Sequence, residues 1–434
     1  MDEVAPDIEA ISDQIDTVNF RLVGSSLDGY LDKMKSLFET FSLVKDREDL
    51  VRVILGNGED RCYLVMAQNT AEIRASGGFP GAAGFITVKD GILEVGEMSS
   101  IVNFVAYGNP VPTGTTDHEN VLFGDLYVWQ DRDACYNPHF PKVASISTIS
   151  CENFTDTEID GVISMTPHIV QEMLKITGET VVLEDGTEIN GDNALQVVDR
   201  DLYLKYEGLR EKASKNAKYL DSLFSDAAKK TMKSFATRFQ LTDADKYVDM
   251  FEQGFKDRTI MIWMVDPEEE EIVTKAGASG KLNFDPEKPE IGVFFGCDDA
   301  ARLGMFIRID VEVGDGTSIE NFTKEYPVTV TLTNYLNEVD LGNADNLTYL
   351  AGHYEGAISS FVHLFAPAGG TISDIQLSNG CEMTMDEYEG LQVGYIYPMM
   401  IYPDEPVTIT YKVTTAPNVD VKPTYVHTPT LQDY

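Results

Sequence analysis

The chain has 434 residues, of which 43% are hydrophobic and 10% are aromatic. This apolar content supports about two or three packed domains and excludes a globally disordered protein. The formal net charge of −39 at pH 7 argues against nucleic acid and anionic membrane surfaces as partners of the whole molecule. The five cysteines lack metal-like spacing and contain no C-x-x-C pair, so we expect mostly buried thiols with room for a single disulfide.

Residues 1–44 are predicted to form an N-terminal stalk of helices. Apolar side chains recur there at steps of three and four residues, and Gly24-Ser25-Ser26 separates two such stretches. Ser26 is a suitable residue to cap the second helix. The sequence contains no run of about 20 apolar residues that could span a membrane.

Residues 45–288 are predicted to form an α/β domain with a mixed or parallel sheet and flanking helices. The continuous apolar run Cys62–Ala67 is typical of a strand buried on both faces. Asp90-Gly91 between two β-rich runs predicts a hairpin. Further along, the pattern predicts a helix at 142–153, a strand at 159–165, a helix from Pro167 to Thr177, a hairpin at 180–189, a helical block at 192–258 and a strand at 259–265.

After about Pro289 the helical periodicity disappears and short alternating runs take over. Examples are Phe306–Val313, Val328–Thr333 and Val407–Val413, separated by Gly, Asn and Asp turns. We therefore predict an antiparallel, Ig-like β-sandwich over 289–416. Residues 417–434 are expected to form a loose tail.

The stretch that follows the first buried strand is the leading candidate for a site. It holds Asn69, Glu72 and Arg74 and continues into Gly77-Gly78. Sites in open α/β sheets lie at the carboxyl ends of strands, where an arginine can bind phosphate and glycines let backbone amides approach an anion. The alternative is a buried structural pair between Glu72 and Arg74 that holds the loop together.

A second candidate is Asp131-Arg132-Asp133. The arginine could bind phosphate while Asp131 or Asp133 holds Mg²⁺, which takes one or two carboxylates together with phosphate oxygens. Two acids beside an arginine are also typical of a solvated turn or an ion pair. Asp160, before Gly161, either contributes to a ligand site or forms a turn into its strand.

Several motifs resemble DUF4012, a bacterial exported family known only as a domain of unknown function. The similar residues are Asn69-x-x-Glu72-x-Arg74-x-x-Gly77-Gly78-Phe79-x-Gly81, Trp129-x-x-Arg132-Asp133-Ala134-x-x-Asn137-Pro138-x-Phe140-Pro141, Asp160-Gly161-Val162-Ile163, Leu174-x-x-Thr177-Gly178 and Asn193. The resemblance covers roughly residues 45–415 and includes a β-rich C-terminal part. It implies an extracellular protein of the cell surface, held by an N-terminal membrane helix that this chain lacks.

The α/β part is also distantly similar to LytR-CpsA-Psr phosphotransferases, which join polyprenyl-pyrophosphate-linked glycopolymers to the cell wall. That similarity implies a LytR-CpsA-Psr-like mixed sheet in which Arg74 and Arg132 grip pyrophosphate, with Asp131 or Asp133 on Mg²⁺. Asn69, Glu72, Gly77, Gly78 and Asp160 would then line the ligand site. The phosphotransferases' Arg-Ser-Asp and Pro-Arg-Asp signatures are missing. The alternative function is a non-catalytic extracellular binding or scaffolding module.

Overall fold

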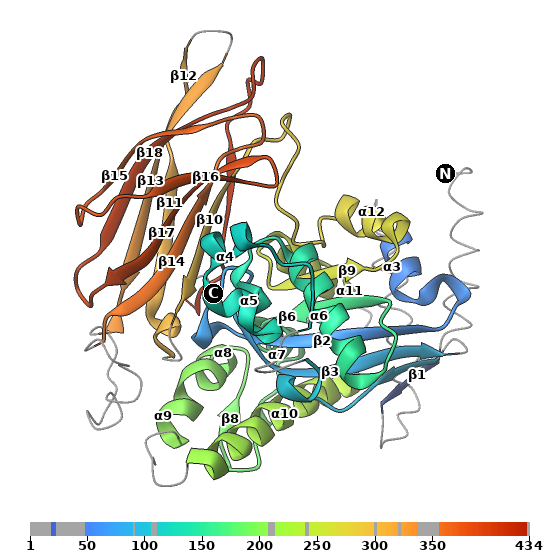
Figure 1. Cartoon of the computed structure of the whole chain (residues 1–434). Helices are drawn as coiled ribbons and strands as arrows, with labels where there is room; N and C mark the ends of the chain where they lie inside the picture. Colours follow the sequence, from blue (N-terminus) through green and yellow to red (C-terminus); the bar gives the residue numbers. More distant parts are fainter. Residues whose placement is uncertain are drawn as a thin grey trace.

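The structure is a computed structural model that describes residues 19–22, 48–89, 92–105, 111–206, 213–238, 243–298, 302–319, 323–336 and 356–431. Its α/β region is built on a seven-stranded sheet with the order β1-β4-β3-β2-β6-β9 and β5 paired to β3 (Figure 1). The strands are β1 (Asn19–Leu22), β2 (Arg61–Asn69), β3 (Phe79–Lys89), β4 (Ile92–Val95), β5 (Ser99–Ser100), β6 (Gly161–Met165) and β9 (Ile260–Met264).

The sheet is mixed, as predicted. Strand β2 pairs in parallel with β6 and antiparallel with β3. Strand β3 pairs antiparallel with β4, as the hairpin prediction requires, and the predicted turn residues Asp90-Gly91 lie outside the described residues. The crossover from β2 to β6 contains α6 (Phe140–Thr155), which lies within reach of both β6 and β9. Helix α7 (His168–Thr177) follows β6 and ends at Gly178, whose φ of 67° matches the left-handed cap expected there.

Helices cover both faces of this sheet. Because successive side chains of a strand point to opposite faces, those of β2 enter two different hydrophobic clusters. Leu64 and Met66 pack with α6 and with the short helices α4 (Asp117–Phe123) and α5 (Asp125–Trp129). Tyr63 packs on the other face with α3 (Glu48–Ile54), α7, α11 (Ala244–Lys256) and α12 (Pro267–Lys275). The remaining described elements of this region are the hairpin β7 (Val181–Val182) and β8 (Glu188–Ile189) and the helices α8 (Ala194–Gln196), α9 (Leu202–Tyr206) and α10 (Ala213–Arg238).

The C-terminal region contains two five-stranded sheets, which confirms the β-rich part of the predicted fold. One sheet has the order β16-β17-β14-β10-β19, and the other has the order β11-β13-β18-β15 with β12 paired to β13. The strands are β10 (Glu290–Cys297), β11 (Ile307–Val313), β12 (Thr317–Ser318), β13 (Lys324–Asn334), β14 (Ile358–Phe365), β15 (Ile372–Leu377), β16 (Thr384–Tyr388), β17 (Leu391–Ile401), β18 (Val407–Thr414) and β19 (Thr424–His427).

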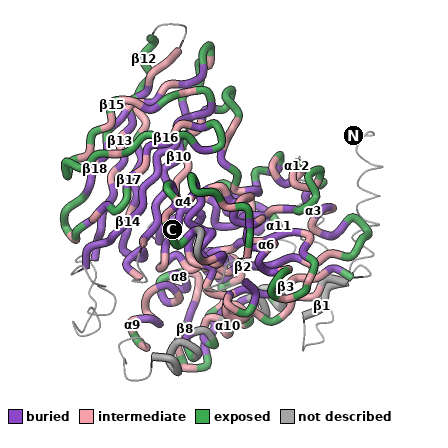
Figure 2. The backbone as a smooth tube through the Cα atoms, in the orientation of Figure 1, coloured by how far each residue is buried: buried purple, intermediate pink, exposed green. Residues whose placement is uncertain are grey.

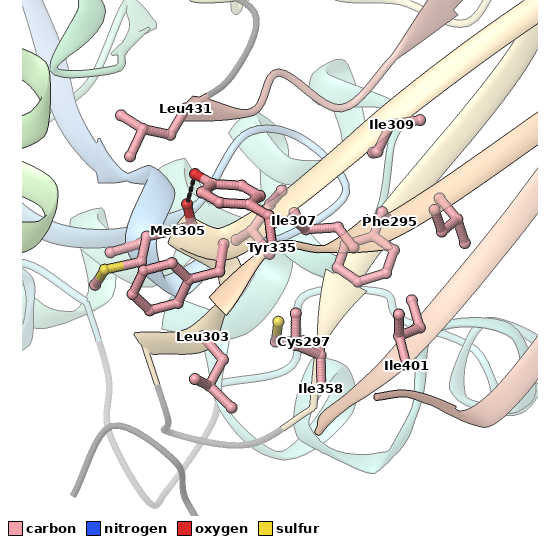
Figure 3. Packing of buried hydrophobic residues seen from close by; sticks show 14 of the residues in the cluster. Phe295, Cys297, Leu303, Met305, Ile307, Ile309, Tyr335, Ile358, Ile401 and Leu431 are labelled. Carbon is pink, nitrogen blue, oxygen red and sulfur yellow. Dashed lines mark hydrogen bonds between the residues drawn. The ribbon is translucent and has the colours of Figure 1, made fainter. Parts of the chain in front are cut away.

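The central strands of the first of these sheets, β10 and β14, are buried on both faces and lie between the α/β region and the second sheet. All eight residues of β14 are buried, and Figure 2 shows buried backbone through β10 and β14. In β10, Val293 and Phe295 pack into the sandwich core, whereas Phe294 packs against the α/β region. The sandwich core continues through Met305 and Tyr335 toward the α/β region (Figure 3). The two regions therefore share hydrophobic cores.

Two expectations for the ends of the chain differ from the structure. Of the N-terminal helical stalk, only Asn19–Leu22 are described, and they form strand β1, which pairs in parallel with β4; the rest of the stalk lies outside the described residues. The segment expected to be a loose tail contains β19, which pairs in parallel with β10. Thr428 and Leu431 beyond it are buried, so apolar and main-chain contacts hold this segment.

Among the described helices, none combines the length and apolar character needed to cross a membrane.

Candidate functional site at the carboxyl end of β2

The loop that follows β2 begins with a capped turn. Asn69 ends the strand, and its side-chain oxygen accepts a hydrogen bond from the Ala71 amide at 2.9 Å. The other half of the Asn69 amide donates to the Tyr203 hydroxyl at 2.5 Å. Both halves of this side chain are therefore engaged within the protein.

Arg74 is buried in this loop, with only 4% of its surface exposed. Its Nη2 lies 3.9 Å from Asp133 Oδ1, its Nη1 donates to the Ile73 carbonyl at 3.1 Å, and its guanidinium lies over the Tyr136 ring at 4.5 Å. Burial raises the pKa of Asp133, and the guanidinium groups of Arg74 and Arg132 oppose that rise. The positive charge of Arg74 is thus met by an internal carboxylate and an aromatic face.

Glu72 has a partner that sequence reasoning missed. Its Oε1 lies 2.9 Å from Nη2 of Arg302, and the Arg302 guanidinium lies over the Tyr203 ring at 4.3 Å. The structural alternative expected Glu72 to pair with Arg74. In the structure Glu72 pairs with Arg302 and Arg74 lies near Asp133, so the expected pairing is wrong. The two residues belong to two separate ion pairs, and one of these reaches across to the start of the β-sandwich.

Gly77 and Gly78 allow the loop to fold back onto β2. Gly77 has a φ of +125°, and a Cβ there would collide with the Gln68 side chain. A Cβ on Gly78 would collide with the main chain of Asn69. The Gly77 amide donates to the Arg74 carbonyl at 2.8 Å. These contacts account for both glycines by packing, and they leave the Gly77 amide engaged.

The β-sandwich and the C-terminal segment cover the loop through hydrogen bonds to main-chain carbonyls. The Cys297 amide of β10 donates to the Ile73 carbonyl at 3.0 Å, and the Tyr136 hydroxyl donates to the Cys297 carbonyl at 2.8 Å. From the C-terminal segment, the Thr428 hydroxyl donates to the Ala75 carbonyl at 3.0 Å. The carboxyl end of β2 is therefore enclosed between the two regions.

Asp131, Arg132 and Asp133 lie in a 3-10 helix, residues Asp131–Tyr136. The Asp131 carboxylate accepts from the Ser150 hydroxyl at 2.6 Å, and burial raises its pKa. Asp133 is 3.6 Å from Nε of Arg132, which donates to Gln130 at 2.9 Å. The two carboxylates face different partners. Within the described ranges, no group of three His, Cys, Asp or Glu side chains is placed to hold a metal ion.

Asp160 lies at the opposite end of the sheet. Its Oδ2 accepts from the Cys62 amide at 2.7 Å, at the beginning of β2. A strand rises about 3.3 Å per residue, so Cys62 and Asn69 are roughly 23 Å apart. The structure therefore separates Asp160 from Arg74, and its hydrogen bond to Cys62 matches the turn alternative.

A buried acid beside the loop was also missed by sequence reasoning. Asp199 accepts a hydrogen bond from the Thr70 hydroxyl, and its other oxygen, Oδ1, has no hydrogen-bond partner within the described residues. Burial raises the pKa of Asp199 to about 7. It lies in a π-helical turn, residues Val197–Asp201. No local pattern announces this contact, because Thr70 and Asp199 are far apart in the sequence.

Comparison with known proteins confirms the resemblance predicted from the motifs. Residues 58–203 match the family described as "Protein of unknown function (DUF4012)", and this range contains every residue of the Asn69–Gly81, Trp129–Pro141 and Asp160–Ile163 motifs. No curated protein matches the sequence. Among solved structures, protein gbs0355 from Streptococcus agalactiae is similar with 11% identity and a TM-score of 0.25, over 52% of this chain and 76% of that chain. This likeness is too low to carry an argument.

Proposed function

Because residues 58–203 belong to a family of unknown function, we propose a function from the side chains themselves. The chain is a non-catalytic binding or scaffolding module of the bacterial cell surface, in which the α/β region and the β-sandwich act as one unit. The location outside the cell follows from the family resemblance of the motifs and is part of the proposal.

One observation supports this function above the others, namely the enclosure of Arg74. A phosphate-binding arginine must reach its ligand, but Arg74 is 4% exposed and faces Asp133 and Tyr136. The main chain of its loop is bonded to Cys297 and Thr428 of the sandwich. A motif used in this way connects two regions, which is what a scaffold requires.

The competing function is transfer of a polyprenyl-pyrophosphate-linked glycopolymer with Mg²⁺. It requires Arg74 and Arg132 to converge on pyrophosphate and a nearby carboxylate to hold the metal. Arg132 lies 3.6 Å from Asp133. Its side chain is half-buried whereas that of Arg74 is buried, so Arg132 is the more accessible of the two arginines. The two functions differ in whether Mg²⁺ and these two arginines are needed to bind pyrophosphate.

The test is binding of a polyprenyl pyrophosphate to the purified full chain, measured by isothermal titration calorimetry in detergent with and without Mg²⁺. We expect no saturable binding that depends on Mg²⁺. Binding that requires Mg²⁺ and is lost in Arg132→Ala, with the unfolding temperature unchanged, would overturn the proposal.

The matched control is Arg308→Ala. Arg308 is an exposed arginine of β11 that also pairs with an aspartate, Asp310, at 3.3 Å. It lies outside the group formed by Arg74, Arg132, Asp133 and Tyr136, which we call the Arg74 cluster. This variant should therefore behave like the unmodified chain in either outcome.

A further inference from the structure

A groove lies beside the last strand of the protein, with a volume of about 650 Å³. We call it the β19 groove. One wall is the segment from Lys422 to His427, and the other is formed by Lys256 at the end of α11, by Asp257 directly after it and by Val313 at the end of β11. Its volume falls within the range typical of ligand sites, about 300–1,000 Å³. None of the Arg74 cluster lines it.

The β19 wall offers an unpaired strand edge. β19 is the terminal strand of its sheet and pairs only with β10 among the described strands. The amides of Thr424 and Thr428 donate to carbonyls of Pro289 and Val293 on the β10 side. Because alternate residues of a strand turn their main-chain groups to opposite sides, the N–H and C=O of Tyr425 point away from β10, and Tyr425 is one of the residues that line the groove. An uncovered edge of this kind is a template for pairing with another chain.

The charged lining of the groove is positive in a strongly acidic protein. It contains Lys256 and Lys422 against Asp257, while the whole chain carries −39. The Asp257 carboxylate accepts from Gln253 at 2.5 Å, and Lys256 forms no ion pair within the described part of the chain. Lys422 is 52% exposed and lies 4.0 Å from Asp315, itself a fully exposed residue. Both lysines are therefore able to meet carboxylates of a ligand.

The aromatic side chain of the strand is also open. Tyr425 is 47% exposed, and its ring lies parallel to that of His427 at an angle of 19° and a centroid distance of 6.1 Å. Both rings project on the same face of β19, because they are two residues apart. If a further strand paired with β19, every second side chain of that strand would lie on the same face of the sheet as these two rings. The main chain of the added strand would pair with the main chain of Tyr425.

We propose that the β19 groove binds an extended acidic peptide, which adds to the β10 sheet as a further strand alongside β19. Main-chain hydrogen bonds to Tyr425 fix the peptide, and Lys256 and Lys422 select for acidic side chains. This site goes beyond the proposed scaffolding function, because it holds whether or not the Arg74 cluster binds pyrophosphate. It gives the cell-surface module a partner of defined chemistry.

The first experiment measures binding of an end-blocked, fluorescent octapeptide of alternating valine and glutamate to the full chain by fluorescence anisotropy. We expect saturable binding that weakens as NaCl rises, because exposed charges are screened. The same peptide with lysine in place of glutamate should bind at least about tenfold more weakly. Equal binding of the two peptides would overturn the proposal, and so would binding of polygalacturonate, an anionic polysaccharide, without binding of either peptide.

The second experiment tests the main-chain contacts. Two versions of the peptide carry N-methyl groups on alternate residues, in complementary positions, so that each can donate hydrogen bonds from one edge only. We expect one version to bind like the parent and the other to lose binding. Equal retention of binding by both would show that the strand edge is not used, and would overturn the proposal.

The third experiment locates the site on the protein. Lys256→Glu combined with Lys422→Glu should weaken binding of the acidic peptide by at least about tenfold. Lys246→Glu combined with Lys275→Glu makes the same change in net charge on exposed lysines that do not line the groove, and should have a much smaller effect. An equal loss in both double variants would mean that only net charge matters and would overturn the assignment. Circular dichroism confirms that each variant is folded.

Discussion

The two ends of β2 carry similar chemistry in different surroundings. At the carboxyl end, Arg74 lies near Asp133, and both are buried. At the amino end, Arg61 lies 2.9 Å from Glu269 on α12 and also pairs with the exposed Glu59. The amino end is half-buried, whereas the sandwich covers the carboxyl end through Cys297 and Thr428.

This difference limits a familiar rule about α/β proteins. Carboxyl ends of strands form binding sites when loops there face a crevice. In this protein the main chain after β2 bonds instead to a neighbouring sheet, as the Cys297 amide does with the Ile73 carbonyl at 3.0 Å. A motif with arginine, carboxylate and glycine can therefore serve to join two regions. The following predictions test that contrast.

Arg74→Met should have the largest effect on stability. It removes one of the two guanidinium groups near the buried Asp133 and leaves Tyr136 without its cation, so we expect a loss of about 3–5 kcal/mol in the free energy of unfolding. Arg132, 3.6 Å from Asp133, should keep the loss toward the lower value. Urea unfolding measures it, and Arg308→Met on the surface should change stability by less than about 0.5 kcal/mol. An Arg74→Met variant as stable as the unmodified chain would contradict the interpretation that Arg74 is a buried structural residue.

Asp199 should make the carboxyl end sensitive to pH. Burial raises the pKa of Asp199 to about 7 in the folded chain, against about 3.9 when unfolded. Between these values the folded state holds a proton that the unfolded state releases. The free energy of unfolding should therefore fall as pH rises from about 4 to about 7, by up to roughly 1.4 kcal/mol per pH unit, and then level off.

Asp199→Asn isolates this contribution. Glu270 has a pKa raised to about 7 by burial and acts in the same direction, so the informative quantity is the difference between the two pH profiles. That difference should change between pH 4 and 7 and be constant above pH 8. Parallel profiles would show that Asp199 is not the group responsible.

Much of the fold could be predicted from local sequence patterns. The apolar run Cys62–Ala67 and Pro167 before a helix each specify structure through contacts within a few residues. One local signal was overlooked: Thr116 and Glu119 form a capping box at the start of α4, a helix that is not among those predicted from the sequence.

The partners of the candidate site could not be predicted in the same way. The Glu72–Arg302 and Thr70–Asp199 contacts join residues more than a hundred positions apart, and no spacing rule links them. The C-terminal segment was expected to be a loose tail for the same reason. Its strand β19 forms by pairing with β10, which is distant in the sequence. The sequence shows which charged and glycine residues follow β2. Whether those residues are buried or exposed depends on how the α/β region and the β-sandwich pack together.

Thr428→Val tests the cover itself. The Thr428 hydroxyl donates to the Ala75 carbonyl and accepts from the Phe295 amide, both at 3.0 Å. Valine has nearly the same shape and leaves both buried groups unpaired, so we expect a loss of about 2–3 kcal/mol in urea unfolding. Thr424→Val, on the exposed part of the same segment, should cost less than about 0.5 kcal/mol. Equal effects of the two substitutions would mean that the hydrogen bonds of the Thr428 hydroxyl contribute little to stability.

Asp160→Ala should have the smallest effect and should act independently of Arg74. It removes the 2.7 Å hydrogen bond to the Cys62 amide at the half-buried amino end, so we expect a loss of about 1–2 kcal/mol. Sites this far apart usually add to within about 0.5 kcal/mol, so Asp160→Ala combined with Arg74→Met should lose the sum of the two single effects. An interaction energy well above that limit would join the two ends of β2 into one site, as the family resemblance first implied. Additivity would instead leave Asp160 as the residue that fixes the beginning of β2.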